Sequence, residues 1–192
     1  EPAIENYEKA LDKDRNAGEV HYNLGCVHFN KKNYNKALEE FVKALEWDPN
    51  DVYTHNSLGN TYYKLGKYEQ AIRMHEGALK LAPSDAYSFK GLGDVYYSQK
   101  KFKEAKKYYK KALEQNKHMG KAYFGLALVY SGERNFEKAI ETYKKAIELE
   151  GQNERLHGNL AYAYYAVNNY DMAIAEYKLA IELDSSIPWN YG

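Results

Sequence analysis

The sequence repeats itself every 34 residues, and this period restricts the possible folds more than any other feature. Counted from Gly18, the full copies occupy residues 18–51, 52–85, 86–119, 120–153 and 154–187. Residues 1–17 match the second half of a preceding copy, and residues 188–192 match the opening of a following one. Periods of about 20 to 50 residues are typical of repeat arrays, in which each unit packs against its neighbours. The sequence therefore predicts a single array over residues 1–192.

The spacing of apolar residues inside each copy predicts two helices. The seventh residue is always leucine and the eleventh is tyrosine or histidine, so both lie on one face of a helix. The eighth residue is glycine or alanine, and two alanines recur seven residues apart in the second half of the copy. Because small side chains let helices approach closely, each copy is expected to form a helical hairpin. An aromatic residue opens each expected second helix, namely Tyr34, Tyr68, Phe102, Phe136 and Tyr170.

Turn-forming residues separate the expected helices. Pro49 and Pro83 follow the ends of two second helices, where a proline blocks further helix. The turns inside the hairpins are expected to place a residue in the left-handed conformation that favours glycine and asparagine. The residues at that place are Asn33, Gly66, Lys101, Asn135 and Asn169, of which Lys101 suits the conformation less than the others.

This pattern resembles the tetratricopeptide repeat family across essentially the whole chain. The family's hallmark residues are matched in the second full copy by His55, Leu58, Gly59, Tyr62, Ala71, Ala78 and Pro83. Proline is absent from the last three full copies, where Lys117, Gly151 and Ser185 stand. The resemblance implies an all-α fold, a right-handed α-solenoid superhelix of antiparallel helix-turn-helix repeats.

The composition disfavours several classes of partner and location. The chain has 27 basic and 27 acidic residues, so it lacks the strong positive charge typical of nucleic-acid-binding proteins. No apolar run reaches the roughly 20 residues that a membrane-spanning helix needs, and the N-terminal segment does not resemble a signal peptide. The single cysteine, Cys26, suits a reducing compartment, although a secreted helical protein that needs no disulfide would fit as well. We therefore expect a cytoplasmic protein with neither a nucleic-acid nor a membrane partner.

No catalytic, cofactor or metal motif is present, so the sequence predicts a protein that is not an enzyme. The sequence lacks a metal-binding His-Glu-x-x-His motif, a paired Cys-x-x-Cys, a phosphate-binding loop and a dinucleotide-binding fingerprint. Three of the six histidines, His21, His55 and His157, share one packing position. His28 and His75 replace core aromatic residues, and His118 lies in a loop. We expect no metal site and no cofactor.

The resemblance also implies a binding surface. In the family, the first helix of each hairpin lines the concave face of the superhelix, through the second, fifth, ninth, twelfth and thirteenth residues of each copy. Aromatic residues are abundant at these positions, and a tyrosine offers a large contact area with a polar tip, which suits a binding anchor. The predicted peptide-binding residues are Tyr22, Phe29, Tyr53, Asn56, Asn60, Tyr63, Lys64, Tyr87, Lys90, Asp94, Tyr97, Lys121, Phe124, Arg155 and Tyr162.

The sequence predicts a non-catalytic scaffold that holds a peptide or partner segment in this groove, with other readings left open. Some of the aromatic residues could instead pack between neighbouring first helices. The chain could also be a self-assembling scaffold or the substrate-presenting arm of a larger enzyme. Two motifs known in the family, a clamp for a C-terminal carboxylate and a ladder of asparagines, are incomplete here.

The two ends of the array are expected to leave apolar surface uncovered. Ile4 and Tyr7 belong to a second helix without its own first helix, and Trp189 and Tyr191 begin a hairpin that does not close. Terminal units of repeat arrays normally carry polar capping faces. Self-association through these ends is therefore a further expectation.

Overall fold

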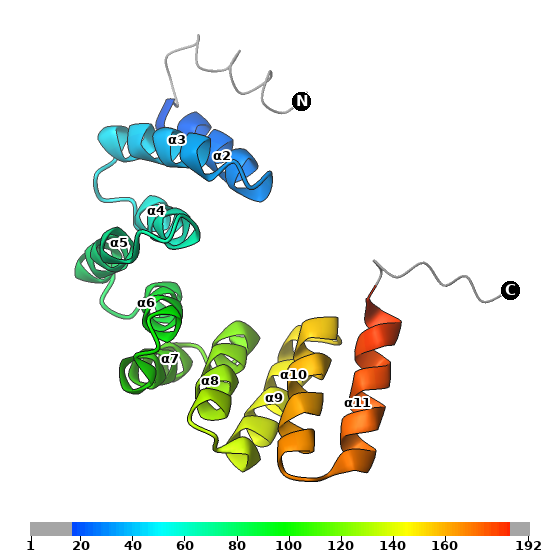
Figure 1. Cartoon of the computed structure of the whole chain (residues 1–192). Helices are drawn as coiled ribbons and strands as arrows, with labels where there is room; N and C mark the ends of the chain where they lie inside the picture. The colour runs from blue at the N-terminus through cyan, green and yellow to red at the C-terminus, as the bar shows by residue number, and fades with distance from the viewer. Residues whose placement is uncertain (1–16, 185–192) are drawn as a thin grey trace, which may run out of the picture. The chain divides into compact units, whose positions relative to one another are not determined.

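The computed structural model describes residues 17–184, and within that range the chain forms ten α-helices and no β-strand. The helices are α2 (Ala17–Asn30), α3 (Tyr34–Trp47), α4 (Val52–Lys64), α5 (Tyr68–Leu81), α6 (Ala86–Ser98), α7 (Phe102–Gln115), α8 (Gly120–Gly132), α9 (Phe136–Glu150), α10 (Glu154–Ala166) and α11 (Tyr170–Leu183) (Figure 1). Each full copy of the repeat thus contributes two helices. The predicted all-α class and the helix-turn-helix repeats are confirmed. The partial copies predicted at the two ends lie outside the described residues, except for Ala17.

The helices belong to two compact units, which divide within α6 between Val95 and Tyr96. In the first unit α2 packs against α3 and α4 against α5, and each pair runs antiparallel across a short turn (Figure 1). In the second unit α8 packs against α9 and α10 against α11 in the same way. The single array over residues 1–192 stays a prediction.

The turns inside the hairpins contain the predicted left-handed residue, but one position earlier than predicted in four copies. The residues with positive φ are Lys32, Gly66, Lys100, Arg134 and Asn168. The residue that follows donates its backbone N–H to the carbonyl five residues earlier, as Asn33 does to His28 at 2.9 Å. This bond closes the first helix and requires the left-handed conformation at the residue before the donor. Asn33, Lys101, Asn135 and Asn169 instead occupy the N-cap position of the second helix, so their predicted conformation was wrong.

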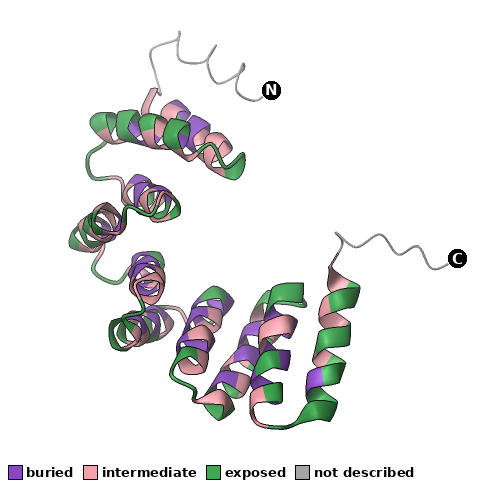
Figure 2. Ribbon diagram, in the orientation of Figure 1, coloured by how far each residue is buried: buried purple, intermediate pink, exposed green. Residues whose placement is uncertain are grey.

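The core of each unit lies between helices, on the stripes of small and apolar residues that the sequence predicted (Figure 2). The leucine at the seventh position is buried in all five copies. Both series of alanines are also buried, apart from Ala180, which is half-buried. Proline residues 49 and 83 follow the last residues of α3 and α5, as predicted.

A ring from the second helix fills the space between two first helices. The ring belongs to residue 24 of the copy, and it is almost fully buried in four copies, at 1 % exposure or less: Phe41, His75, Tyr109 and Tyr143. Glycines make room for it. A Cβ added to Gly59 or to Gly91 would lie 2.6 Å or 2.3 Å from an atom of the His75 ring. The two glycines belong to α4 and α6, so the ring lies between its own hairpin partner and the first helix of the next copy.

The second unit allows a matched test of this packing. A Cβ at Gly125 in α8 would lie 2.3 Å from the buried Tyr109 ring, whereas a Cβ at Gly158 in α10 would meet no atom within 4 Å. We expect Gly125→Ala to reduce the free energy of unfolding by about 1–2 kcal/mol, because overpacking outweighs the gain in helix propensity. Gly158→Ala should increase it by up to about 1 kcal/mol.

Urea denaturation of the two variants and the parent measures both effects. A stabilised Gly125→Ala variant would contradict the close approach of ring and helix.

Candidate functional site

The predicted binding residues divide into two groups by exposure. One group is exposed and consists of Tyr53, Asn60, Lys64, Tyr87, Lys121, Arg155 and Tyr162. The other is half-buried and consists of Tyr22, Phe29, Asn56, Tyr63, Lys90, Asp94, Tyr97 and Phe124. The second residue of every copy is in the exposed group or is the exposed Glu19, so this position faces solvent throughout the two units. The exposed tyrosines are the residues of the set best suited to contact a partner.

The half-buried aromatic residues at the twelfth position pack against the aromatic residue that opens the second helix. The ring centroids of Phe29 and Tyr34 are 5.4 Å apart, and those of Tyr63 and Tyr68 are 6.2 Å apart. In the second unit, Tyr97 pairs with Phe102 at 5.8 Å. Such pairs stabilise a fold beyond the area that they bury. Tyr63 and Tyr97 therefore hold their hairpins together through their own second helices, a role different from the packing between neighbouring first helices that the alternative interpretation predicted.

Asn56 is committed to a polar network inside the first unit. Its amide nitrogen donates to the Asp85 carboxylate at 2.7 Å, and its amide oxygen accepts from the Ser88 hydroxyl at 2.8 Å. The Nδ1 atom of His75 lies 3.0 Å from the same oxygen. Burial raises the pKa of Asp85, but hydrogen bonds from Ser88 and Asn56 outweigh it, and the net pKa is lowered. Asn56 thus stabilises the first unit from within, since both the nitrogen and the oxygen of its amide already have a hydrogen-bond partner.

Three of the predicted basic residues are partly engaged by neighbours. Lys90 donates to Asp94 at 2.5 Å. The Lys64 ammonium lies over the Tyr63 ring at 5.6 Å. The Arg155 guanidinium lies over the Phe124 ring at 4.8 Å. Because Lys64 and Arg155 are exposed, each could still turn its charge toward a bound ligand.

Two cavities open between α2 and α4 in the first unit. The smaller one has a volume of 130 Å³ and is lined by Cys26, Phe29, Asn30, Phe41, Ser57 and Asn60. The larger one has a volume of 380 Å³ and is lined by Gly18, Glu19, Tyr22, Asn23, Ala44, Asp48, Asp51, Tyr53 and Thr54. Both contain residues from the predicted binding positions. The sequence did not indicate these cavities, because their depth depends on how neighbouring helices pack.

Family models match most of the chain. Two models described as "Tetratricopeptide repeat" match residues 50–118 and 86–150, and residues 154–187. A third, described as "TPR repeat", matches residues 27–66 and 135–168. The chain belongs to the tetratricopeptide repeat family. The resemblance predicted from the leucine, glycine, tyrosine and alanine positions is confirmed.

Solved structures of tetratricopeptide repeat proteins share the fold. A MamA protein structure is 26 % identical with a TM-score of 0.67, covering 89 % of this chain and 93 % of that one. The protein TTC0263 of Thermus thermophilus is 23 % identical with a TM-score of 0.77, covering 88 % of this chain and 92 % of its own. Yeast Tom70 is 23 % identical with a TM-score of 0.78, covering 95 % of this chain and 39 % of its own. No curated protein matches the sequence.

Proteins of the tetratricopeptide repeat family are protein-interaction scaffolds, and this chain is a member of that family. Such scaffolds are generally non-catalytic. Among the helices of residues 17–184, none combines the length and the apolar character needed to cross a membrane.

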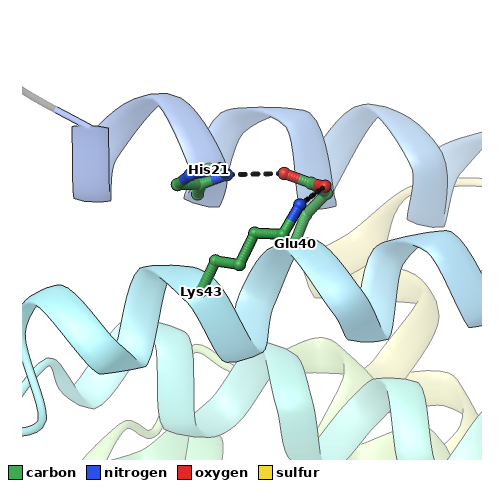
Figure 3. Close-up of polar contacts among 3 residues, drawn as sticks. All are labelled: His21, Glu40 and Lys43. Carbon is green, nitrogen blue, oxygen red and sulfur yellow. Dashed lines mark hydrogen bonds and ion pairs between the residues drawn. The ribbon is translucent and has the colours of Figure 1, made fainter. Parts of the chain in front are cut away.

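The histidines of the tetratricopeptide repeats lie in packing contacts, apart from the loop residue His118. His21 on α2 places Nδ1 2.6 Å from the Glu40 carboxylate of α3, and Lys43 donates to that carboxylate at 2.8 Å (Figure 3). His157 makes the same contact with Glu176 at 2.6 Å. Residues 17–184 contain no group of three or more side chains of the metal-binding types placed to hold a metal ion.

His75 makes the stability of the tetratricopeptide fold dependent on pH. Burial, and to a smaller extent the charge of Lys90, lower the pKa of His75 from 6.5 to about 4, and the charge of Asp85 opposes them only in part. The unfolded chain therefore binds this proton more tightly than the folded one. The resulting stability is present above about pH 6.5 and is lost as the pH falls to about 4, by roughly 3 kcal/mol.

The variant His75→Phe tests this dependence, because phenylalanine occupies the same position at Phe41. Urea denaturation at pH 7 and pH 4.5 should show a smaller loss of stability in the variant than in the parent. Equal losses in the two proteins would mean that other groups cause the acid sensitivity.

Proposed function

We propose that this chain is a non-catalytic scaffold that binds a peptide or an extended segment of a partner protein on its first-helix positions. The exposed tyrosines supply the contact area, and Asn60, Lys64, Lys121 and Arg155 supply polar selectivity. The balanced charge of the chain favours a protein over a nucleic acid as the partner. The half-buried thiol of Cys26 suits a reducing compartment such as the cytoplasm.

The exposure of the tyrosines at the binding positions is the observation that carries this proposal. Tyr53 is 72 % exposed and Tyr87 is 66 % exposed, and in the second unit Tyr162 is 51 % exposed. The core does not use these rings, since buried rings of the second helices already fill it. Large aromatic side chains that contribute little to folding are typical of binding anchors.

Replacing the exposed tyrosines should weaken binding without unfolding the protein. We expect the double variant Tyr53→Ala and Tyr87→Ala to reduce partner binding about tenfold or more, since anchor residues at interfaces commonly contribute at least 1 kcal/mol each. Its melting temperature should stay close to that of the parent. Quantitative affinity capture from the native source, followed by titration with the captured partner, measures the effect.

Two further variants serve as controls for that experiment. Tyr170→Ala removes a tyrosine that is 54 % exposed on a second helix, and it should retain the partner. Tyr63→Ala should lower the melting temperature, because its ring packs on Tyr68. The proposal fails if the double variant binds the partner as tightly as the parent does.

A second candidate function is self-assembly through the last described helix. Tyr177 on α11 occupies the position at which the other four copies bury their ring, yet it is 41 % exposed. Ile174 and Ile181 lie on the same face of α11 and are 54 % and 49 % exposed. An uncovered apolar face of this kind favours association with a second molecule. The corresponding face at the N-terminal end lies outside the described residues.

Charge introduced into that face should abolish self-association. We expect the variant Tyr177→Lys with Ile181→Lys to remain monomeric at concentrations where the parent forms larger species, as measured by light scattering over a concentration series. Ala175→Lys adds a lysine elsewhere on α11 and should behave like the parent. A parent protein that is monomeric at every concentration would rule out this second function.

A further inference from the structure

We propose that the first unit contains a two-part peptide subsite between α2 and α4. The smaller cavity takes one aliphatic side chain, and the larger cavity takes a lysine or arginine side chain about four residues away in an extended peptide. This inference rests on the proposed function and names the chemistry of the ligand.

The smaller cavity has the size and lining for one aliphatic side chain. Its volume is 130 Å³, and the rings of Phe29 and Phe41 contribute to its lining. An apolar protein cavity of about 150 Å³ is known to hold a benzene molecule. A valine, leucine, isoleucine or methionine side chain therefore fits, whereas an indole ring does not.

Two asparagines border this cavity and can recognise a peptide backbone. Asn30 and Asn60 are both exposed, and neither side chain hydrogen-bonds to another described residue. A carboxamide offers donors and an acceptor, which complement the carbonyl and the N–H of a peptide group. A peptide that inserts an aliphatic side chain can therefore pair its backbone with these amides.

The charge of the larger cavity is complementary to a basic side chain. Its lining includes Glu19, Asp48 and Asp51 and contains no lysine or arginine. Asp51 accepts the backbone N–H groups of Tyr53 and Thr54, so part of its charge is used to cap α4. Glu19 and Asp48 are exposed, and Tyr53 lines the same cavity. Carboxylates next to an aromatic face form a favourable site for an ammonium or guanidinium group.

The distance between the cavities sets the spacing of the two ligand residues. The α2 residues that line them are centred about eight positions apart, which corresponds to about 12 Å along a helix. An extended peptide advances about 3.3 Å per residue and presents every second side chain to the same side. Residues four apart span about 13 Å and match the separation, whereas residues two apart span only about 7 Å.

A series of synthetic peptides tests the subsite directly. Each fluorescein-labelled peptide carries one lysine and one leucine in a glycine-serine background, at spacings of two, three, four and six residues in both orders. Fluorescence anisotropy with the full chain should show the tightest binding at a spacing of four in one of the orders. Changing leucine to alanine in that peptide should weaken binding about tenfold, and changing lysine to glutamate should weaken it at least about threefold.

Variants of the chain test whether the preference for leucine arises at the smaller cavity and the preference for lysine at the larger one. Cys26→Leu fills the smaller cavity, and the equivalent position in α8 is Leu128, so the repeat accepts a leucine there. This variant should lose the preference for leucine over alanine, while Leu128→Cys, its counterpart in the second unit, should bind like the parent. Glu19→Lys with Asp48→Lys should reverse the preference from lysine to glutamate in the peptide.

The outcomes separate this inference from the proposed function. The subsite is wrong if no spacing is preferred, or if Cys26→Leu binds the leucine and alanine peptides as the parent does. The proposed function is still supported in that case if the double variant Tyr53→Ala and Tyr87→Ala binds the captured partner more weakly than the parent does. Both fail if every variant retains that partner at the parent's affinity.

Discussion

The fit of one buried ring between two glycine-containing helices is the contact on which the rest of the structure depends. His75 is confined on two sides by Gly59 and Gly91, and Gly125 lies close to the Tyr109 ring. Each ring joins its own hairpin to the first helix of the next copy. Because a single repeat has no separate hydrophobic core, the close approach of the helices and the burial of the ring stabilise each other.

The buried contacts use only some positions of each first helix, so the remaining positions can take part in binding. Their seventh and eighth residues pack inward, whereas their second residues face solvent and can vary between copies. Tyr53, Tyr87, Lys121 and Arg155 show that variation at a single repeat position. Chemistry at this position can therefore change from copy to copy without disturbing the contact between ring and glycine.

The hairpins, the buried alanines and the exposed second positions could be predicted from the sequence, because each recurs in every copy and helical spacing fixes its direction. The internal role of Asn56 could not, since it depends on Asp85, Ser88 and His75, which are close in space but distant along the chain. The left-handed residue was misplaced because asparagine suits both a C-cap and an N-cap. The cavities beside α2 depend on the separation of helices, which no local pattern encodes.

The network around Asn56 also limits how such a gene segment can change its number of repeats. Asp85 belongs to the second copy and Ser88 to the third, and the fourth copy holds Ala122 at the position of Ser88, which cannot donate to the Asn56 amide. Joining the second copy directly to the fourth would keep Asp85 but remove the hydroxyl that donates to the Asn56 amide oxygen, at a cost of about 0.5–1.5 kcal/mol. Loss of the third copy alone therefore costs stability that loss of the second and third copies together would not, because Asn56 leaves with the second copy.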